Sequence, residues 1–125
     1  PELTTELFLR DIDYGPDENR PEDEVVARIG KAALEAWERE SIPPPGWRVD
    51  PAALVGNWQE LFSELAKEEG THLIVTSNGI ARFALAAAGE TRADAKLGTG
   101  AYGIVELSGG EAAVSVWNVR PPVAP

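Results

Sequence analysis

A short apolar run in the second half of the chain constrains the fold more than any other feature. Residues 72–76 (HLIVT) are too few for a helix and show no alternation of apolar and polar side chains. This pattern is typical of a strand buried on both faces, as in a parallel sheet. Such a strand needs parallel neighbours, and no second run of this kind is readable in the sequence. We therefore expect a fragment, a lost N-terminal strand, or a segment exchanged with a partner such as a second copy in a homodimer.

The remaining patterns predict helices. Apolar residues recur at helical spacing in three stretches, 21–42, 50–69 and 80–88. The first must end before the proline run that starts at Pro43, because proline cannot continue a helix. Asp50 followed by proline is a favourable start for the second, and Gly70 is a natural stop. Trp37 and Trp58 lie on the apolar stripes, so we expect both to pack in the core.

The end of the chain predicts a β-hairpin. Two apolar runs, 101–107 and 112–119, flank the turn-forming Ser108-Gly109-Gly110. Helices mixed with strands in this order indicate the α/β class. The length of 125 residues allows one domain, 1–125, which we expect to be partial.

Composition narrows the function. The net charge of -10 disfavours nucleic acid and anionic membranes as partners, since phosphate backbones are bound through lysine and arginine. The sequence has no cysteine, which excludes disulfides, cysteine-based zinc sites and cysteine nucleophiles. No signal peptide or apolar run of membrane-spanning length is visible, so a cytoplasmic location is the default expectation. The acidic pairs, such as Asp11 with Asp13, lack the spacing of a calcium loop.

The most informative piece for function is the junction between the apolar run and the third helix, residues 75–82. In α/β sheets ligands bind beyond the carboxyl ends of the strands, and a helix start there offers backbone N–H groups to a phosphate. Ser77 and Asn78 can add side-chain hydrogen bonds. The same residues also suit a plain helix cap, so the local sequence leaves both roles open.

This junction resembles the second histidine motif of the histidine phosphatase (phosphoglycerate mutase-like) superfamily, in which a strand leads through Ser-His-Gly-Gly into a helix carrying an arginine. Ser77, Gly79 and Arg82 match the motif, and Asn78 stands where the family has its second active-site histidine. The resemblance implies that these four residues bind substrate, with Arg82 more a support for the turn than a direct contact. Asparagine can donate hydrogen bonds but carries no charge, which predicts weakened or altered catalysis.

A second stretch resembles the same superfamily. Residues 9–15 (LRDIDYG) are similar to the family's Leu-x-Glu-x-x-x-Gly segment, in which the glutamate protonates the leaving oxygen. Asp11 falls on that glutamate, one methylene shorter, and the resemblance implies that it is the general acid. From the residues alone, Asp11 and Asp13 are equally explained as turn formers on a solvated loop. The glycine-containing run 96–101 is similar to the family's approach to its last strands, where we expect a structural role.

One part of the family pattern is missing. The family's nucleophile is the histidine of an Arg-His-Gly motif on its first strand, and the sequence contains no such motif. The single histidine, His72, precedes the apolar run and is expected at its far end from Asn78.

The resemblance therefore implies a phosphoglycerate mutase-like sheet flanked by helices, incomplete at its N-terminus. The implied activity is phosphatase- or phosphomutase-type phosphoryl transfer through a phosphohistidine, on phosphate or a phosphorylated small molecule, with no metal or organic cofactor. This chain alone lacks the nucleophile and is expected to be inactive. The alternative is a non-catalytic phosphate-binding or protein-interaction module on the same scaffold.

Overall fold

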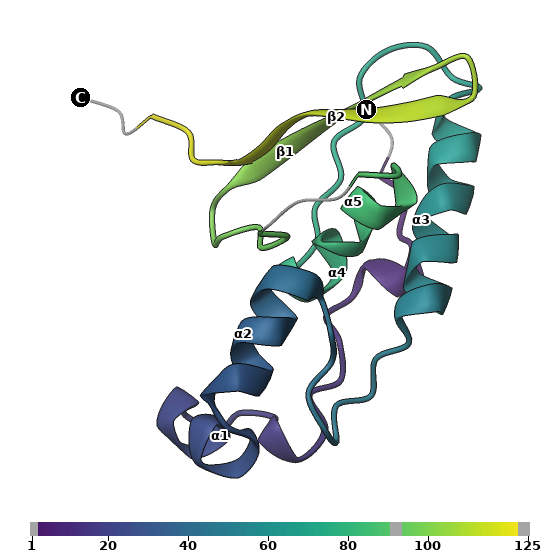
Figure 1. The fold of residues 1–125 in the computed structure, drawn as a ribbon. Helices are drawn as coiled ribbons and strands as arrows, with labels where there is room; N and C mark the ends of the chain where they lie inside the picture. Colours follow the sequence, from purple (N-terminus) through teal and green to yellow (C-terminus); the bar gives the residue numbers. More distant parts are fainter. Residues whose placement is uncertain (1–2, 91–93, 123–125) are drawn as a thin grey trace.

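The computed structural model describes residues 3–90 and 94–122. Helices joined by irregular segments precede the terminal hairpin (Figure 1). The elements in order are two short 3₁₀ helices (Leu7–Leu9 and Gly15–Asp17), α1 (Glu22–Ile29), α2 (Lys31–Glu40), α3 (Pro51–Leu65), α4 (Asn78–Ala81), α5 (Phe83–Ala87), β1 (Tyr102–Ser108) and β2 (Glu111–Val119). None of the helices among the described residues is long and apolar enough to cross a membrane.

The first predicted helix is two helices. Gly30 separates α1 from α2 with a backbone φ of +89°, a conformation open to glycine because it has no Cβ. The N–H of Gly30 still donates to Val26 O at 2.8 Å, which closes α1 before the chain turns. The third predicted helix is likewise divided, into α4 and α5, at Arg82. Apolar spacing alone predicted continuous helices because it carries no information on these breaks.

Helix α3 begins as predicted. The Asp50 carboxylate accepts a hydrogen bond from Ala53 N at 3.2 Å, which caps the helix, and Pro51 is its first residue. The helix ends at Leu65, and turns continue from there toward Gly70.

The predicted hairpin is confirmed. Strands β1 and β2 pair antiparallel, with Val105 opposite Val114 and Ser108 opposite Glu111. Gly109 and Gly110 form the two-residue turn with φ of +59° and +82°, the conformation that a type I′ turn requires. Exposed and half-buried residues alternate along β1, so one face of the hairpin packs on the helices.

The predicted buried strand at residues 72–76 is wrong. This stretch belongs to neither strand of the described sheet, and the side chains of Leu73 and Val75 are 90% and 80% exposed. A strand needs a neighbour to pair its backbone groups, and no described segment lies beside this one in a ladder. The chain is still α/β, with a small, incomplete sheet flanked by helices.

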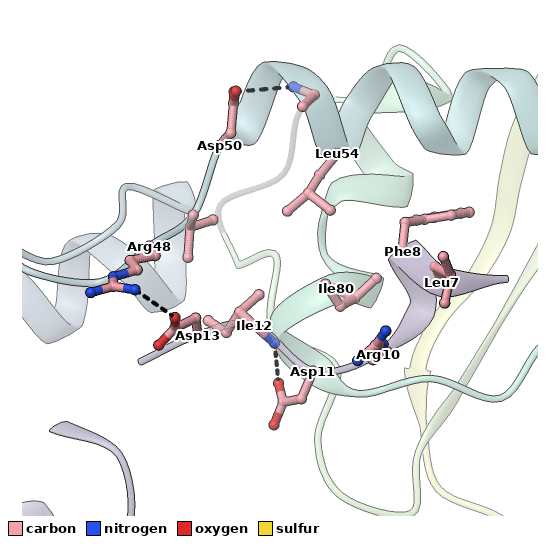
Figure 2. A pocket seen from close by; sticks show the side chains of 12 residues that line it. Leu7, Phe8, Arg10, Asp11, Ile12, Asp13, Arg48, Asp50, Leu54 and Ile80 are labelled. Carbon is pink, nitrogen blue, oxygen red and sulfur yellow. Dashed lines mark hydrogen bonds and ion pairs between the residues drawn. The ribbon is translucent and has the colours of Figure 1, made fainter. Parts of the chain in front are cut away.

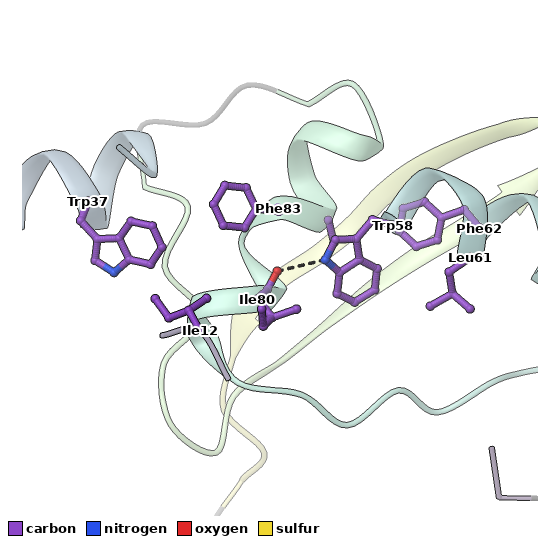
Figure 3. Close-up of a cluster of buried hydrophobic side chains, with 8 residues drawn as sticks. Ile12, Trp37, Trp58, Leu61, Phe62, Ile80 and Phe83 are labelled. Carbon is purple, nitrogen blue, oxygen red and sulfur yellow. Dashed lines mark hydrogen bonds between the residues drawn. The ribbon is translucent and has the colours of Figure 1, made fainter. Parts of the chain in front are cut away.

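The core lies where α3 packs against α4 and α5. Trp58 and Phe62 from α3, Ile80 and Phe83 from the α4–α5 segment, and Trp37 from α2 are all buried (Figure 3). Trp58 Nε1 donates to Ile80 O at 3.0 Å, so the buried indole N–H has a partner. Burying each of these large side chains stabilises the fold by about 1.5–3 kcal/mol. The expectation that Trp37 and Trp58 pack in the core is confirmed.

A buried carboxylate ties α1 to the loop that precedes α3. Arg28 donates from Nε to Asp17 Oδ1 at 2.7 Å, and Trp47 Nε1 donates to Asp17 Oδ2 at 2.8 Å. The hydrogen bond from Arg28 holds the pKa of Asp17 at about 2, below its ordinary value of 3.8. The segment that contains Asp17 is therefore fixed to α1 and to the loop before α3.

Candidate functional site

Asp11 and Ser77 meet in the structure although they are far apart in the sequence. Ser77 Oγ donates to Asp11 Oδ1 at 3.0 Å, across a separation of 66 residues. The neighbouring Thr76 Oγ1 donates to Leu9 O at 2.8 Å. Two hydrogen bonds from adjacent residues fix the register of the two segments. The two stretches singled out in the sequence therefore lie side by side in the structure.

The two oxygens of the Asp11 carboxylate have different surroundings. Oδ1 accepts three hydrogen bonds, from Ile12 N at 2.9 Å, Tyr14 Oη at 3.3 Å and Ser77 Oγ at 3.0 Å. Oδ2 accepts none from the described residues, and Asp11 is exposed to solvent. Figure 2 shows the carboxylate directed away from Leu54. Oδ2 is therefore the carboxylate oxygen left open to solvent or to a ligand.

Gly79 is buried directly against Asp11 and Ile12. A Cβ built on Gly79 would lie 3.0 Å from Ile12 Cγ1 and 3.2 Å from Asp11 Oδ1. Ile12 is itself buried in the core, so its side chain has little room to move. Close approach of the turn to the Asp11 segment therefore requires a residue without a side chain at this position.

The side-chain oxygen of Asn78 is hydrogen-bonded to other residues of the protein. Its Oδ1 accepts from Arg82 Nη2 at 3.0 Å and from Leu97 N at 2.9 Å, which ties the turn to the loop that precedes β1. Its Nδ2 donates no hydrogen bond within the part of the chain that the structure describes. What Asn78 can offer a ligand is therefore its amide NH₂ group.

Arg82 lies inside the protein and is only 1% exposed. Its guanidinium stacks on the Trp37 ring at 4.0 Å, donates to Trp37 O, and donates from Nη2 to Asn78 Oδ1. Burial lowers the pKa of Arg82 to about 10, which leaves it charged at neutral pH. In this position Arg82 offers no surface to a ligand, and it holds Asn78 and the turn in place.

Two open surface pockets border Asp11. One, of about 430 Å³, is lined by apolar side chains such as Leu54 and Ile80, together with Arg10 and Arg48 (Figure 2). The other, of about 360 Å³, is lined by acidic and aromatic residues that include Tyr14. Residues 77–79 line neither cavity. Of the predicted site residues, Asp11 is thus the one that borders these open pockets, and the turn at residues 77–79 lies beside it.

Tyr14 belongs to this site, and the sequence analysis did not identify it. Its ring lies at 4.8 Å from that of Trp47 in a T-shaped arrangement, and its hydroxyl donates to Asp11. Burial, and then the negative charge of Asp11, raises the pKa of Tyr14 to about 12. Its position three residues after Asp11 in the same motif was the available signal. Tyr14 keeps its proton at neutral pH and acts as a donor to Asp11.

The family model for the histidine phosphatase superfamily (branch 1) matches residues 1–120. The chain belongs to the histidine phosphatase superfamily. The match covers both the segment of Asp11 and the turn at Ser77. Comparisons with curated proteins and with solved structures give no match. Membership supports a phosphatase- or mutase-type function in general terms.

Two other expectations from the sequence concern the position of His72 and the binding of a metal ion. His72 is exposed and lies at the opposite end of residues 72–76 from the turn. Among the described residues there is no group of three or more histidine or acidic side chains that could hold a metal ion.

Replacing Gly79 with alanine tests the close approach of the turn to Asp11. We expect Gly79→Ala to destabilise the fold by roughly 1–3 kcal/mol, because the new methyl group must displace Ile12 or Asp11. Gly56→Ala in α3 is the matched control, since nothing lies within 4 Å of its built Cβ. The control should stabilise by up to about 1 kcal/mol through helix propensity. Urea unfolding measures both; a Gly79→Ala chain as stable as the control would contradict the geometry.

Replacing Asp11 with asparagine tests the contact with Tyr14. The pKa of Tyr14, raised to about 12, should fall toward its ordinary value of 10.0 and stay above it, because burial remains after the charge of Asp11 is removed. Near-ultraviolet absorbance of tyrosinate follows the titration, and Tyr14→Phe assigns it. Circular dichroism at each pH restricts the comparison to folded protein. An unchanged Tyr14 titration in Asp11→Asn would show that the two side chains are not in contact.

Proposed function

We propose that the chain supplies the leaving-group acid and part of the phosphate site of a phosphatase or phosphomutase that works through a phosphohistidine. The observation that supports this most directly is the 3.0 Å hydrogen bond between Ser77 and Asp11, because it joins the two motif segments in one place. The substrate class is a phosphorylated small molecule.

The proposed chemistry has two steps. In the first, a histidine nitrogen attacks phosphorus, an N–P bond forms and the ester O–P bond breaks, while Asp11 gives a proton to the leaving oxygen. In the second, water attacks phosphorus, the N–P bond breaks, and Asp11 takes a proton from that water. Asp11 Oδ2 is the atom suited to both transfers, since Oδ1 is already occupied by three donors. A general acid placed in this way contributes typically about 10²–10⁴-fold to the rate.

In this proposal the protein groups that contact phosphate carry no charge. The NH₂ group of Asn78 and the backbone N–H groups of Asn78 and Gly79 donate no hydrogen bond to other described residues, so they remain able to donate to phosphate oxygens. Asn78 is half-buried and Gly79 is buried, which makes Asn78 the more accessible donor. Uncharged donors stabilise a developing negative charge less than an imidazolium would, so phosphate should be held weakly here.

The nucleophile in this proposal comes from outside these 125 residues. The sequence holds a single histidine, His72, which is exposed and separated from Ser77 by the stretch 73–76. We expect the chain alone to be inactive. A cytoplasmic location is part of the proposal, since nothing in its chemistry needs an oxidising compartment and the sequence has no cysteine.

A second candidate function is a non-catalytic phosphate-binding or protein-interaction module. The exposed apolar side chains of Leu73 and Val75 favour it, because surfaces of this kind mark contact sites.

Hydrolysis of p-nitrophenyl phosphate by the longest polypeptide that the gene encodes distinguishes the two candidates. We expect turnover, and a fall in kcat of about 10²–10⁴-fold in Asp11→Asn. Asp23→Asn, the same change at an exposed position of α1, is the control and should keep full activity. No turnover from a folded polypeptide would exclude the enzyme and favour the module. Turnover that survives Asp11→Asn would exclude Asp11 as the acid.

A further inference from the structure

The side chain of Tyr14 is held between Asp11 and Trp47. Its hydroxyl donates to Asp11 Oδ1 at 3.3 Å, and its ring lies at 4.8 Å from the Trp47 ring with an angle of 81° between the planes. This T-shaped arrangement is one that aromatic pairs prefer. The backbone N–H of Tyr14 donates to Glu18 Oε1 at 3.0 Å. The hydroxyl, ring and backbone of Tyr14 thus each have a separate contact, which restricts the orientation of the side chain.

Trp47 is in turn fixed by a buried carboxylate. Its Nε1 donates to Asp17 Oδ2 at 2.8 Å, and the Asp17 side chain is only 4% exposed. Both oxygens of Asp17 also accept from Arg28, whose Nη2 donates further to Pro45 O at 2.7 Å. These charge-assisted hydrogen bonds are stronger than neutral ones, and a buried group left without its partner is costly. Asp17 therefore fixes Trp47 relative to α1.

The backbones that carry these two rings are also in contact. Arg48 N donates to Asp13 O at 2.8 Å, and the two residues form an isolated antiparallel bridge. Gly15 has a φ of +58°, and a Cβ built on it would lie 2.1 Å from Gly46 O. Such a close approach requires a residue without a side chain. The spacing of the two rings is therefore set by the backbone as well as by the side chains.

We propose that Tyr14 is a positioning residue that fixes the rotamer of the Asp11 carboxylate, and that Asp17 holds Tyr14 in this role through Trp47. The proposal rests on the proposed function, in which Asp11 Oδ2 transfers the proton. Asp11 is exposed, and an exposed aspartate side chain samples several staggered rotamers. Tyr14 acts through Asp11 and makes no contact with the substrate in this proposal.

Tyr14 adds a restraint that the other two donors to Oδ1 do not supply. The N–H of Ile12 belongs to the residue next to Asp11 and moves with it, so it does not fix the carboxylate relative to the fold. Ser77 ties Oδ1 to the turn before α4, but a carboxylate held by one such bond can still rotate about it. Tyr14 ties the same oxygen to the rings and to α1. The two ties together fix the direction in which Oδ2 points.

The rotamer of Asp11 can be measured without a catalytic assay. Three-bond couplings to the carboxyl carbon, recorded by NMR on the isotope-labelled chain, give the populations about χ1. We expect one dominant rotamer. In Tyr14→Phe the ratio of that rotamer to the others should fall by about 3–10-fold, the effect of one hydrogen bond. Tyr102→Phe, the same change at an exposed position of β1, is the control and should leave the couplings unchanged.

The role of Asp17 is tested in the same way. Asp17→Asn should change the Asp11 couplings in the same direction as Tyr14→Phe, because an amide NH₂ group cannot accept a hydrogen bond from Trp47. Asp23→Asn, at an exposed position of α1, is the matched control. If Asp17→Asn does not fold, Trp47→Phe replaces it, since that change removes the donor to Asp17 and keeps an aromatic ring.

Kinetics of the longest polypeptide that the gene encodes separate positioning from a merely structural role. Tyr14→Phe should lower kcat by about 3–10-fold and leave KM unchanged. The loss should be larger with glycerol 2-phosphate, whose leaving alkoxide needs a proton, than with p-nitrophenyl phosphate, whose phenolate leaves readily. In an Asp11→Asn background, Tyr14→Phe should cost nothing further, because its effect passes through Asp11.

Three outcomes overturn the proposal: unchanged Asp11 couplings in folded Tyr14→Phe, equal losses on the two substrates, or a further loss in the Asp11→Asn background. The last two would place the effect of Tyr14 outside the acid. No turnover in the parent polypeptide would instead remove the proposed function, and the couplings alone then decide whether Tyr14 fixes the carboxylate.

Discussion

The hydrogen bond from Ser77 to Asp11 is the contact on which the site depends. It holds together two segments that are 66 residues apart, and the neighbouring bond from Thr76 to Leu9 keeps them in register. One carboxylate oxygen of Asp11 accepts hydrogen bonds from Ser77, Tyr14 and a backbone N–H, and the other accepts none from the described residues. Without this contact Asp11 would be an ordinary loop residue, and the turn would be an ordinary helix start.

The rest of the turn serves to hold this contact in place. Gly79 lets the backbone approach Asp11 and Ile12 closely, because any side chain there would collide with them. Asn78 is held by Arg82, and Arg82 is held by the Trp37 ring and carbonyl group in the core. A buried guanidinium is costly unless its donors are satisfied, and here they are used to position the turn. The turn is therefore positioned by the hydrophobic core, to which α2 contributes Trp37 and α3 contributes Trp58.

The sequence predicted the elements that depend on local patterns. The cap at Asp50, the turn at Gly109 and Gly110, and the burial of Trp37 and Trp58 all follow from neighbouring residues, and all are present. The strand at 72–76 was mispredicted because its stability depends on a neighbour that local patterns cannot supply. Arg82 was expected to support the turn, but its stacking on Trp37 was not predicted, and neither was the contact of Tyr14 with Asp11. Both depend on which surfaces meet in space, and that information is not contained in the spacing of the residues.

The central claim is that Asp11 and the turn at Ser77 form one phosphate-handling site. Amide-resonance NMR of the chain during titration with inorganic phosphate tests it most directly. We predict that shifts concentrate on Ile12 and on residues 77–79, even if binding is weak, and that sulfate competes for the same resonances. Shifts confined to other regions, or no shift at Asn78 and Gly79 at saturating phosphate, would contradict the account.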